Sequence, residues 1–437
     1  MTVRVSGHAY PWDVVGDPGF AERVVRLGVP EVTLAAAYHS TRAATPLHPE
    51  HRVVEAPMAA LYRPVRGRVW GGRRLRPVGA DWVAARDPFG VAAEALRRNG
   101  LRVAAWIVLT HNTRLGNEFP DLAVRNCFGD RYPYALCPGH AEVREYAATL
   151  AGEAVAGVAV DGVSLEACGQ LGIEHNSHHE KTAGAWTAEQ ARVLSVCCCA
   201  ACRSGWRARG LDPAEVVARL KRAAHGGGPD EQGGRGPDPA QVDTRLEGAV
   251  DGGGLDEEWG RELLAVRHES ADLLRGEVLQ RLREEAPGVP VTVHAHPDPW
   301  VTGASPGLTE AAAREVDGLL VPAWPTEPAS AELVAAAIST GLRVDAGGTG
   351  DAGGTGERDA GGTGEWDAGG TGEWDAGGTG VRVDAYVTVL PPADSERVVE
   401  HVGRLLRAGV GGINLYHLGL APGERLAVLG RVVDLVE

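Results

Sequence analysis

The stretch LRVAAWIVLTHN, residues 101–112, is a continuous apolar run that ends in polar side chains. Such a run is typical of a parallel strand that is covered on both faces, because neither face of the strand meets water. The preceding segment PFGVAAEALRRNG (88–100) has a helical pattern, and its last residue, Gly100, suits a helix end. A second helical pattern (140–157) leads to the next apolar run, VAVDGVSLE (158–166). These segments predict consecutive strand–helix units of a parallel sheet.

The same alternation continues toward both ends of the chain. Eight repeats with right-handed crossovers predict an α/β protein, a single (β/α)8 TIM barrel over residues 1–437. An open doubly wound sheet is the alternative, and the absence of a GxGxxG motif after the first strand disfavours it. The expected strands are 3–10, 31–40, 101–112, 158–166, 290–298, 316–324, 381–390 and 411–420, and the expected helices are 20–28, 88–100, 140–157, 257–286, 330–341, 395–409 and 425–437.

Two segments do not fit a compact barrel. A long insertion is predicted after the fourth strand, at 168–258, and its part 224–256 is rich in Gly, Pro and Asp, which indicates a flexible loop. Residues 345–380 contain a repeated DAGGTG unit between LRVDA and VRVDA. This duplication suggests repeat expansion within the DNA that encodes the seventh strand. We expect the repeat to form a disordered surface loop.

The overall composition excludes several classes of protein. The formal net charge of −15 disfavours nucleic acid as a partner, because an acidic chain repels phosphate backbones. No stretch is long and apolar enough to predict a membrane span, and the first residues show no secretory signal pattern. A cytoplasmic location is therefore expected. The seven cysteines form an odd number in a large chain, which argues against a disulfide framework.

Polar and aromatic side chains recur where the predicted strands end. In a barrel of this type, these carboxyl ends carry the chemistry. Aromatic walls with a few hydrogen-bonding groups suit sugar rings, whose apolar faces stack and whose hydroxyl groups need partners. A carbohydrate is therefore the expected small-molecule or oligosaccharide partner. The predicted substrate-binding residues are His8, Tyr10, Tyr38, His39, His111, Asn112, His294, His296, Trp324, Tyr386, Tyr416 and His417.

Glu166 is the strongest catalytic candidate in the sequence. It lies at the expected mouth of the fourth strand, where a carboxylate can act as nucleophile or acid. Asp161 lies five residues earlier, and this odd spacing directs the two side chains to opposite faces of a strand. Asp161 is thus predicted to support Glu166 by orienting a neighbour. The alternative is that Asp161 belongs to a turn and that Glu166 caps a helix.

The segment VDGVSLE (160–166) resembles the fourth-strand signature of α-amylase-type glycoside hydrolases. In that comparison Glu166 takes the nucleophile position, although Ser164 stands where that family has an arginine, and Glu replaces Asp. A longer pattern is similar to a group of uncharacterised hypothetical glycosyl hydrolases. The stretches that carry it are 111–146, VDGVSLE with HHEK, LSVCCCAAC, YVTVLPP and NLYHLGL. The resemblance implies a (β/α)8 barrel and a sugar substrate, with no required cofactor.

Glycoside hydrolysis needs two carboxyl groups across the scissile bond. Asp298, directly after the HAH motif of the fifth strand, is the predicted partner of Glu166, and Asp13 and Asp384 are weaker options. The sequence does not choose between a retaining and an inverting spacing of these groups. A third possibility is a non-catalytic barrel that binds sugar without a second acid.

A metal-dependent hydrolase is the rival hypothesis. Histidines at the strand ends can bind a divalent ion together with Asp161 or Glu166. The first strand lacks the HxH pair that amidohydrolases usually carry there, and HAH appears on the fifth strand instead. The histidines in question are His8, His39, His111, His294 and His296.

The cysteine-rich segment LSVCCCAACRSGW contains a second candidate metal site. Cys197, Cys199 and Cys202 have the CxCxxC spacing, and a CxxC pair can hold one zinc ion from a tight turn. A closed site needs a fourth ligand, which Cys137, Cys168 or a histidine can supply. Such a zinc ion would be structural and would fix the insertion after the fourth strand. Buried free cysteines or redox chemistry are the alternatives.

Overall fold

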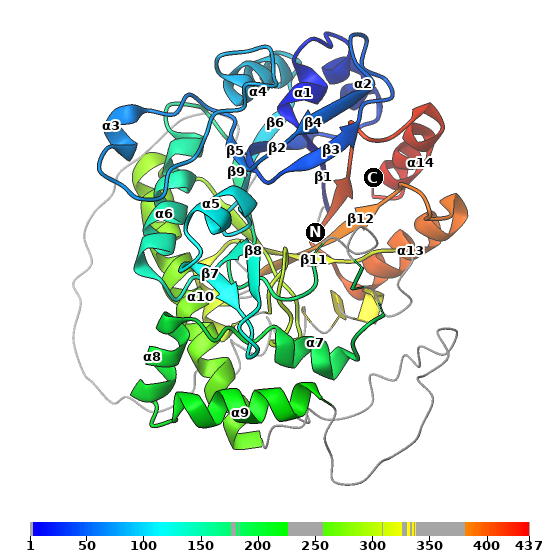
Figure 1. Ribbon diagram of the computed structural model, residues 1–437. Coiled ribbons are helices and arrows are strands. Elements are labelled where there is room, and N and C mark those ends of the chain that lie inside the picture. Colours follow the sequence, from blue (N-terminus) through cyan, green and yellow to red (C-terminus); the bar gives the residue numbers. More distant parts are fainter. Residues whose placement is uncertain are drawn as a thin grey trace, which may run out of the picture.

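The computed structural model shows a closed barrel of parallel strands with helices around it (Figure 1). It describes residues 3–175, 181–225 except 183, 257–325 except 308, most of 330–337, and 381–436. The predicted flexible segment 224–256, apart from its first two residues, and the DAGGTG repeat at 345–380 lie outside the described residues, as does much of the predicted helix at 330–341.

The sheet closes because β1 (Arg4–Ala9) pairs in parallel with both β2 (Glu31–Tyr38) and β13 (Gly412–Tyr416). Of the nine strands in this sheet, only the short β5 (Ala60–Leu61) is antiparallel, and it lies beside β2. The prediction of an eight-stranded TIM barrel is confirmed, and the open doubly wound alternative is wrong. The remaining barrel strands are β6 (Arg102–Val108), β9 (Gly162–Glu166), β10 (Val291–His294), β11 (Gly318–Pro322) and β12 (Arg382–Thr388).

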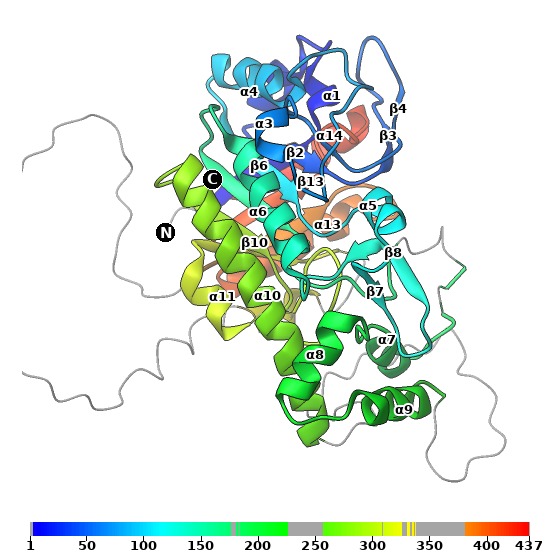
Figure 2. The same ribbon diagram turned by 60° about the vertical axis from the view of Figure 1, so that its left-hand side comes forward.

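Helices follow the strands and cover the barrel from outside. Their apolar faces pack on the outward side chains of the strands in one core. The longest of them, α10, lies along α6 (Figure 2), where Gly152 of α6 leaves space for the Arg281 side chain of α10. These helices are α2 (Phe20–Arg26), α4 (Pro88–Arg98), α6 (Ala141–Val155), α10 (Glu257–Glu285), α11 (Glu310–Glu315), α13 (Ser395–Ala408) and α14 (Gly423–Asp434).

Short elements extend the loops between strands and helices. The segment after β1 forms α1 (Pro11–Val14), and the segment after β2 forms the hairpin β3 (Thr41–Ala44) and β4 (Val53–Ala56), then β5 and α3 (Gly67–Trp70). The loop after β6 forms α5 (Thr113–Glu118) and the hairpin β7 (Ala123–Arg125) and β8 (Arg131–Leu136). Between β9 and α10 lie α7 (Ala188–Leu194), α8 (Ala200–Ala208) and α9 (Pro213–Ala224). Within the described ranges, no helix has the length and apolar composition needed to cross a bilayer.

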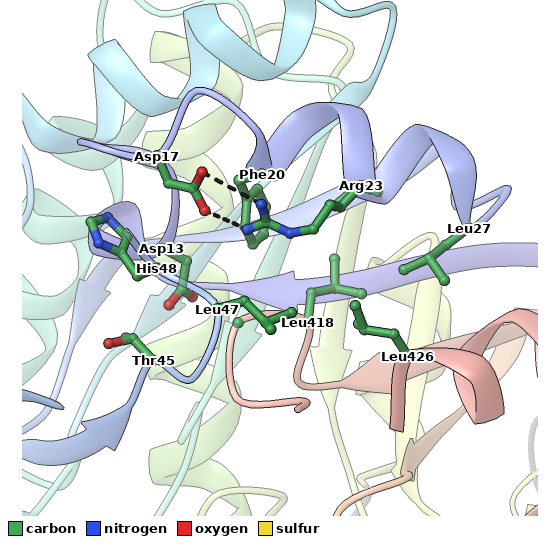
Figure 3. A pocket seen from close by; sticks show the side chains of 12 residues that line it. Asp13, Asp17, Phe20, Arg23, Leu27, Thr45, Leu47, His48, Leu418 and Leu426 are labelled. Atoms are coloured by element: carbon green, nitrogen blue, oxygen red, sulfur yellow. Dashed lines mark hydrogen bonds and ion pairs between the residues drawn. The ribbon is translucent and has the colours of Figure 1, made fainter. Parts of the chain in front are cut away.

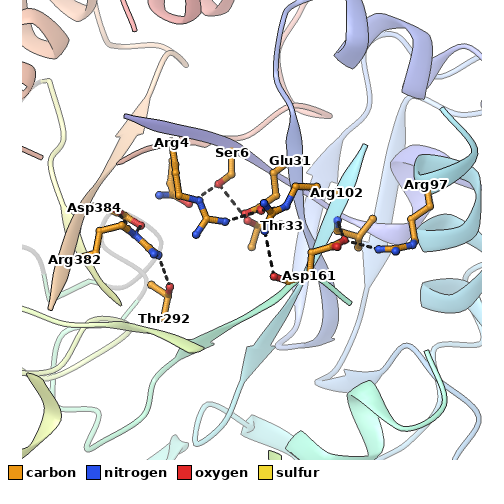
Figure 4. A network of polar contacts seen from close by, with 12 residues as sticks. Arg4, Ser6, Glu31, Thr33, Arg97, Arg102, Asp161, Thr292, Arg382 and Asp384 are labelled. Atoms are coloured by element: carbon orange, nitrogen blue, oxygen red, sulfur yellow. Dashed lines mark hydrogen bonds and ion pairs between the residues drawn. The ribbon is translucent and has the colours of Figure 1, made fainter. Parts of the chain in front are cut away.

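Paired charges lie at the amino-terminal end of the barrel (Figure 4). Arg4 donates to Glu31 at 2.8 Å, and Arg382 donates both to Asp384 at 2.9 Å and to Thr292 at 3.1 Å. Asp384 was a weaker option for the second catalytic acid. It is wrong for that role because it belongs to this network near the start of β12. The side chain of β12 that reaches the carboxyl end of the barrel is Tyr386, two residues later.

Asp161 also lies at the amino-terminal end of the barrel, directly before β9 begins (Figure 4). Its carboxylate accepts a hydrogen bond from the Val103 backbone N–H at 2.9 Å and forms an ion pair with Arg97 of α4. Glu166 is at the other end of the same strand. The two side chains thus lie at opposite ends of β9, and the prediction that Asp161 supports Glu166 in catalysis is wrong.

Replacing Asp161 by alanine tests this structural role. The change leaves the Val103 N–H without its side-chain acceptor and removes the partner of Arg97, so we expect a loss of about 1–3 kcal/mol in the free energy of unfolding. Urea denaturation measures this loss. Asp121→Ala, which breaks the exposed pair with Arg74, is the control and should change stability by less than about 1 kcal/mol. A D161A protein of wild-type stability would contradict the assignment.

Candidate active site at the carboxyl ends of the barrel strands

The carboxyl ends of the barrel strands meet in a buried aromatic cluster around Trp106 of β6. The Trp106 ring lies 4.7 Å from the ring of His8, 4.6 Å from Tyr38 and 5.9 Å from Tyr10, measured between centroids. His417 stacks on Tyr10 at 4.3 Å. These side chains come from four different strands or the residues directly after them, so the cluster exists only in the closed barrel.

A second set of rings continues this cluster across the mouth. Tyr386 of β12 lies 4.5 Å from His8 and 5.5 Å from His294 of β10. Trp324 and Tyr416 lie 5.2 Å and 5.6 Å from Tyr386. The structure therefore brings together eight of the predicted substrate-binding residues, namely His8, Tyr10, Tyr38, His294, Trp324, Tyr386, Tyr416 and His417.

Glu166 projects into this cluster from the end of β9, with 6% of its surface exposed. Its Oε2 atom accepts a hydrogen bond from the indole Nε1 of Trp106 at 2.9 Å. His294 Nδ1 is 4.0 Å from the same oxygen, and the other ring nitrogen of His294 is hydrogen-bonded to Ser164 at 3.0 Å. The hydrogen bond from Trp106 of β6 thus orients the carboxyl group, and the ring of His294 of β10 lies beside it.

Burial controls the protonation of this group. It raises the pKa of Glu166 to about 7, while the hydrogen bond from Trp106 acts in the opposite direction. Burial lowers the pKa of His294 to about 3 and that of His8 well below its usual range. At neutral pH the cluster therefore combines uncharged imidazoles with a carboxyl group that can hold or release a proton.

Several polar atoms of the cluster are buried and have no hydrogen-bond partner within the described residues. They are both ring nitrogens of His8, the hydroxyl group of Tyr386, Nε2 of His417 and Nε1 of Trp12. A buried polar atom without a partner costs free energy, and such atoms are rare in folded proteins. Their concentration around Glu166 and Trp106 indicates a position where the hydroxyl groups of a ligand, or water, make the missing bonds.

Asp13 lies beside this cluster and not within it. Its Oδ2 accepts a hydrogen bond from the Tyr10 backbone N–H at 2.8 Å and is 3.9 Å from His417 Nδ1. Burial raises the pKa of Asp13 to about 7. The carboxyl group borders a small pocket, partly open to solvent, between α2 and the segment after β13 (Figure 3). Asp13 thus orients the backbone of Tyr10 and faces the ring of His417.

The predicted histidine ligand set divides into two groups. His39 stacks on His111 at 4.2 Å, and His111 Nε2 is 2.6 Å from the ring of His175, so these rings form a cluster of their own. His8 and His294 face Glu166 instead, with ring centroids 6.2 Å apart. Among the residues that the structure describes, only a group of cysteines brings three or more ligand atoms within 4.8 Å of one another. The predicted convergence of the strand-end histidines on one ion is wrong.

Asn112 has a structural role. Its side-chain oxygen accepts a hydrogen bond from the Leu115 N–H at 3.0 Å as the cap of α5, and its amide donates to Tyr146 at 3.2 Å. These bonds explain why Asn112 is buried, and its predicted part in substrate binding stays a prediction.

Asp298 and His296 lie beyond the end of β10. The Asp298 carboxylate forms an ion pair with Arg192 at 2.5 Å and accepts from the Trp300 N–H at 2.9 Å. His296 accepts from the Asp298 N–H at 3.0 Å and is partly exposed. No hydrogen bond found in the described part of the chain joins either side chain to Glu166, so their predicted roles in catalysis and binding stay predictions.

Four of the seven cysteines gather outside the barrel, in the segments that follow β8 and β9. Cys197, Cys199 and Cys202 lie at and before the start of α8, and Cys137, from the loop after β8, lies against them. Of the three sources of a fourth ligand considered from the sequence, Cys137 has its sulfur atom within 4.8 Å of the other three in the described part of the chain. Cys168 is buried in the electrostatic neighbourhood of Arg275.

Sequence reasoning missed Trp106, which donates the hydrogen bond to Glu166. It stands inside the apolar run AAWIV, where a tryptophan looks like an ordinary core residue. Its position could have shown this role, because Trp106 lies two residues before the end of β6 and therefore on the same face of the strand as Val108. It also missed His175 as a partner of His111, because the long loop after β9 hides that proximity.

Solved structures of glycoside hydrolases share this architecture. The catalytic domain of β-amylase from Paenibacillus polymyxa superposes with a TM-score of 0.54 at 13% identity, over 99% of this chain and 98% of that chain. The PgaB (BpsB) glycoside hydrolase domain from Bordetella bronchiseptica gives 0.51 at 14%, over 98% and 96%. α-L-Fucosidase isoenzyme 2 from Paenibacillus thiaminolyticus gives 0.51 at 12%, over 100% of this chain and 49% of that one.

These similarities establish the fold. The chain spans about half the length of the fucosidase, and the sequence identities are too low to carry an activity from one protein to another. No protein-family model matches the sequence, and no curated protein matches it. Function has to be argued from the strand-end cluster itself.

The raised pKa of Glu166 predicts a pH-dependent contribution to stability. The folded protein keeps this proton up to about pH 7, whereas the unfolded chain releases it near the ordinary value of 4.5. The stabilisation that comes from this bound proton is fully present below pH 4.5. It is lost as the pH rises from 4.5 through about 7, the pKa of Glu166 in the folded protein. Glu166→Gln, which cannot ionise, should therefore gain stability relative to wild type between pH 4.5 and 8, by about 3 kcal/mol at most.

Urea denaturation of both proteins at pH 5 and pH 8 measures this difference. Glu118→Gln, at an exposed position of α5, is the control and should show no such gain. If the stability difference between E166Q and wild type is the same at both pH values, the proton on Glu166 is not linked to folding.

Proposed function

We propose that this chain is a glycoside-hydrolase-like enzyme that acts on a carbohydrate, with Glu166 as a catalytic carboxyl group. The main observation behind this proposal is the Glu166 carboxyl group, which is buried at the end of β9 and has its pKa raised to about 7. Aromatic rings surround it, and several of their polar atoms have no hydrogen-bond partner in the described residues. The fold shared with glycoside hydrolases agrees with the proposal but does not decide it.

The proposed role of Glu166 is that of a general acid. A group with a pKa near the working pH is both protonated often enough and acidic enough to give its proton to a departing oxygen. Trp106 Nε1 donates a hydrogen bond to Oε2, and this bond stabilises the negative charge that develops on the carboxylate when the proton leaves. The other carboxyl oxygen, Oε1, then carries the proton toward the glycosidic oxygen.

The aromatic cluster supports a sugar ring as the substrate. The partly exposed rings of Trp324 and Tyr416, beside Tyr386, offer apolar faces on which the C–H face of a sugar can stack. His8 and Tyr386 carry unpartnered polar atoms that can bond to the hydroxyl groups at the ring edge. The reaction needs no cofactor in this proposal, since two carboxyl groups suffice for glycoside hydrolysis.

The second carboxyl group has two candidates. Asp298 follows β10, the neighbour of β9 in the barrel, but Arg192 and the Trp300 N–H occupy its carboxylate. Asp13 is buried, its Oδ1 has no hydrogen-bond partner in the described residues, and His417 lies between it and the aromatic cluster. Its environment suits a proton-exchanging group better than that of Asp298, whose ion pair would have to open first.

A sugar-binding barrel without turnover is the second candidate function. It is favoured by one observation: Glu166 is the only carboxyl group that the described contacts place inside the Trp106 cluster. Binding of a sugar without hydrolysis, measured by calorimetry on the same panel of sugars used for turnover, would support this function instead.

Glu166→Gln separates these functions on a panel of aryl glycosides. Loss of a general acid lowers kcat by about 10²–10⁴-fold. The loss should be largest for poor leaving groups and small for dinitrophenolate, which departs without a proton. Sugar binding should persist, because the amide keeps the acceptor for Trp106. An equal loss for all leaving groups would contradict the acid role, and unchanged turnover would remove Glu166 from the mechanism.

Asp13→Asn and Asp298→Asn identify the second group on the same substrates. The variant that removes the second catalytic carboxyl group should lose about 10²-fold or more in kcat for every leaving group, including dinitrophenolate. External azide added to Asp13→Ala and Asp298→Ala tests the nucleophile role, since a small anion can occupy the space that the missing carboxyl group leaves. If neither variant loses turnover, the two-carboxyl mechanism fails for these residues.

A further inference from the structure

Four buried thiols meet outside the barrel, where the insertion after β9 packs on the loop after β8. Their ligand atoms all lie within 4.8 Å of one another. We propose that this cluster binds one structural Zn²⁺ ion as a tetrathiolate site. The cluster does not contact Glu166, so the proposal is independent of the proposed enzymatic function. Its members are Cys137, Cys197, Cys199 and Cys202.

The sulfur–sulfur distances match the shape of such a site. Cys137 Sγ is 3.6 Å from Cys202 Sγ and 3.7 Å from Cys199 Sγ. In a regular tetrahedron with Zn–S bonds of about 2.3 Å, the sulfur atoms are about 3.75 Å apart, which both distances match. A disulfide requires about 2.05 Å, so these sulfur atoms are not cross-linked to each other. The four thiols are therefore spaced for one central ion.

The local backbone explains how one short segment supplies three of the ligands. Cys199 is the N-cap of α8, and Cys202 lies in its first turn, so the CxxC pair opens a helix. The helix amino terminus favours negatively charged thiolates. Cys198, between two ligands, turns away and contacts the Val196 carbonyl at 3.6 Å. Only the alternate residues of the CCC run thus face the cluster.

The opposite wall of the cluster is built around Cys137. Its N–H donates to the Leu122 carbonyl at 2.9 Å, which fixes the loop after β8. Gly139 follows two residues later, and a side chain there would approach Cys137 Sγ to 3.4 Å and Cys202 Sγ to 3.7 Å. The tightest neighbour of such a side chain is the Ala201 Cβ, at 3.2 Å, so glycine at this position lets the loop pack closely on α8 beside the sulfur atoms.

The surroundings also offset part of the charge of the proposed site. A zinc ion with four thiolates carries two net negative charges, which are costly to bury without a cation nearby. Arg267 of α10 lies within electrostatic reach of Cys202 and Cys197, and it donates to the Trp300 carbonyl at 2.9 Å. The site therefore has a fixed counter-charge on a third segment of the chain.

Metal analysis of the purified full-length chain tests the proposal. We expect about one zinc per chain in wild type and less than about a tenth in Cys199→Ser. Cys198→Ser is the matched control: it removes the neighbouring thiol of the same CCC run and should keep the zinc. Titration of wild type with a mercurial, followed with a zinc-binding dye, should release the ion as the four thiols react.

Cobalt substitution covers the case in which C199S does not fold. Co²⁺ bound to wild type should give the visible and thiolate charge-transfer bands of a tetrahedral tetrathiolate site, and Cys137→Ser should shift them. Absence of metal from wild type, iron in place of zinc, loss of zinc from C198S to the same extent as from C199S, or a cobalt spectrum without thiolate bands would each overturn the proposal.

Discussion

The site depends on closure of the sheet through β1, which pairs with β2 on one side and with β13 on the other. Closure sends every second side chain of eight parallel strands into one interior. Ser164 and Glu166 are successive inward side chains of β9, and Asp384 and Tyr386 are successive inward side chains of β12. Ion pairs and hydroxyl groups lie at the amino-terminal end of the barrel interior, and aromatic rings lie at the carboxyl end. The raised pKa of Glu166 follows from this position, because aromatic neighbours replace the water that would solvate its charge.

Parallel strands share one end, so the sequence could identify Glu166, His8 and Tyr386 as neighbours without any knowledge of their contacts. It could not identify the end of the barrel to which Asp161 belongs. The run VAVDGVSLE is apolar on both sides of Asp161, and a strand pattern does not mark whether the strand begins before or after an Asp-Gly pair. Asn112 shows a related ambiguity, because a helix cap and a substrate ligand use the same residue type just after a strand.

The cysteine cluster shows a different limit of sequence reasoning. The CxCxxC spacing indicates three ligands, because a short turn fixes their geometry locally. The fourth ligand, Cys137, is about 60 residues earlier, and its approach depends on how the β7–β8 hairpin folds back onto the insertion. No local pattern records that packing. Trp106 shows the same limit within the barrel. Its hydrogen bond to Glu166 depends on the register between β6 and β9 and not on its neighbours in sequence.

The backbone that leaves Glu166 connects the two sites physically. Ala167 adopts a left-handed conformation with φ of 53°, which costs a residue with a side chain about 1–2 kcal/mol. Thr110 holds this turn by donating to the carbonyls of Ala167 and Gly169, at 2.8 Å and 2.9 Å. Gln170 then donates to the Ser195 carbonyl at 2.6 Å, two residues before the first cysteine of the run. This hydrogen bond joins the turn beside Glu166 to the start of the cysteine segment, so a restraint on that segment can act on the turn. A cross-link outside the barrel can thus stabilise the position of a carboxyl group inside it without contacting that group.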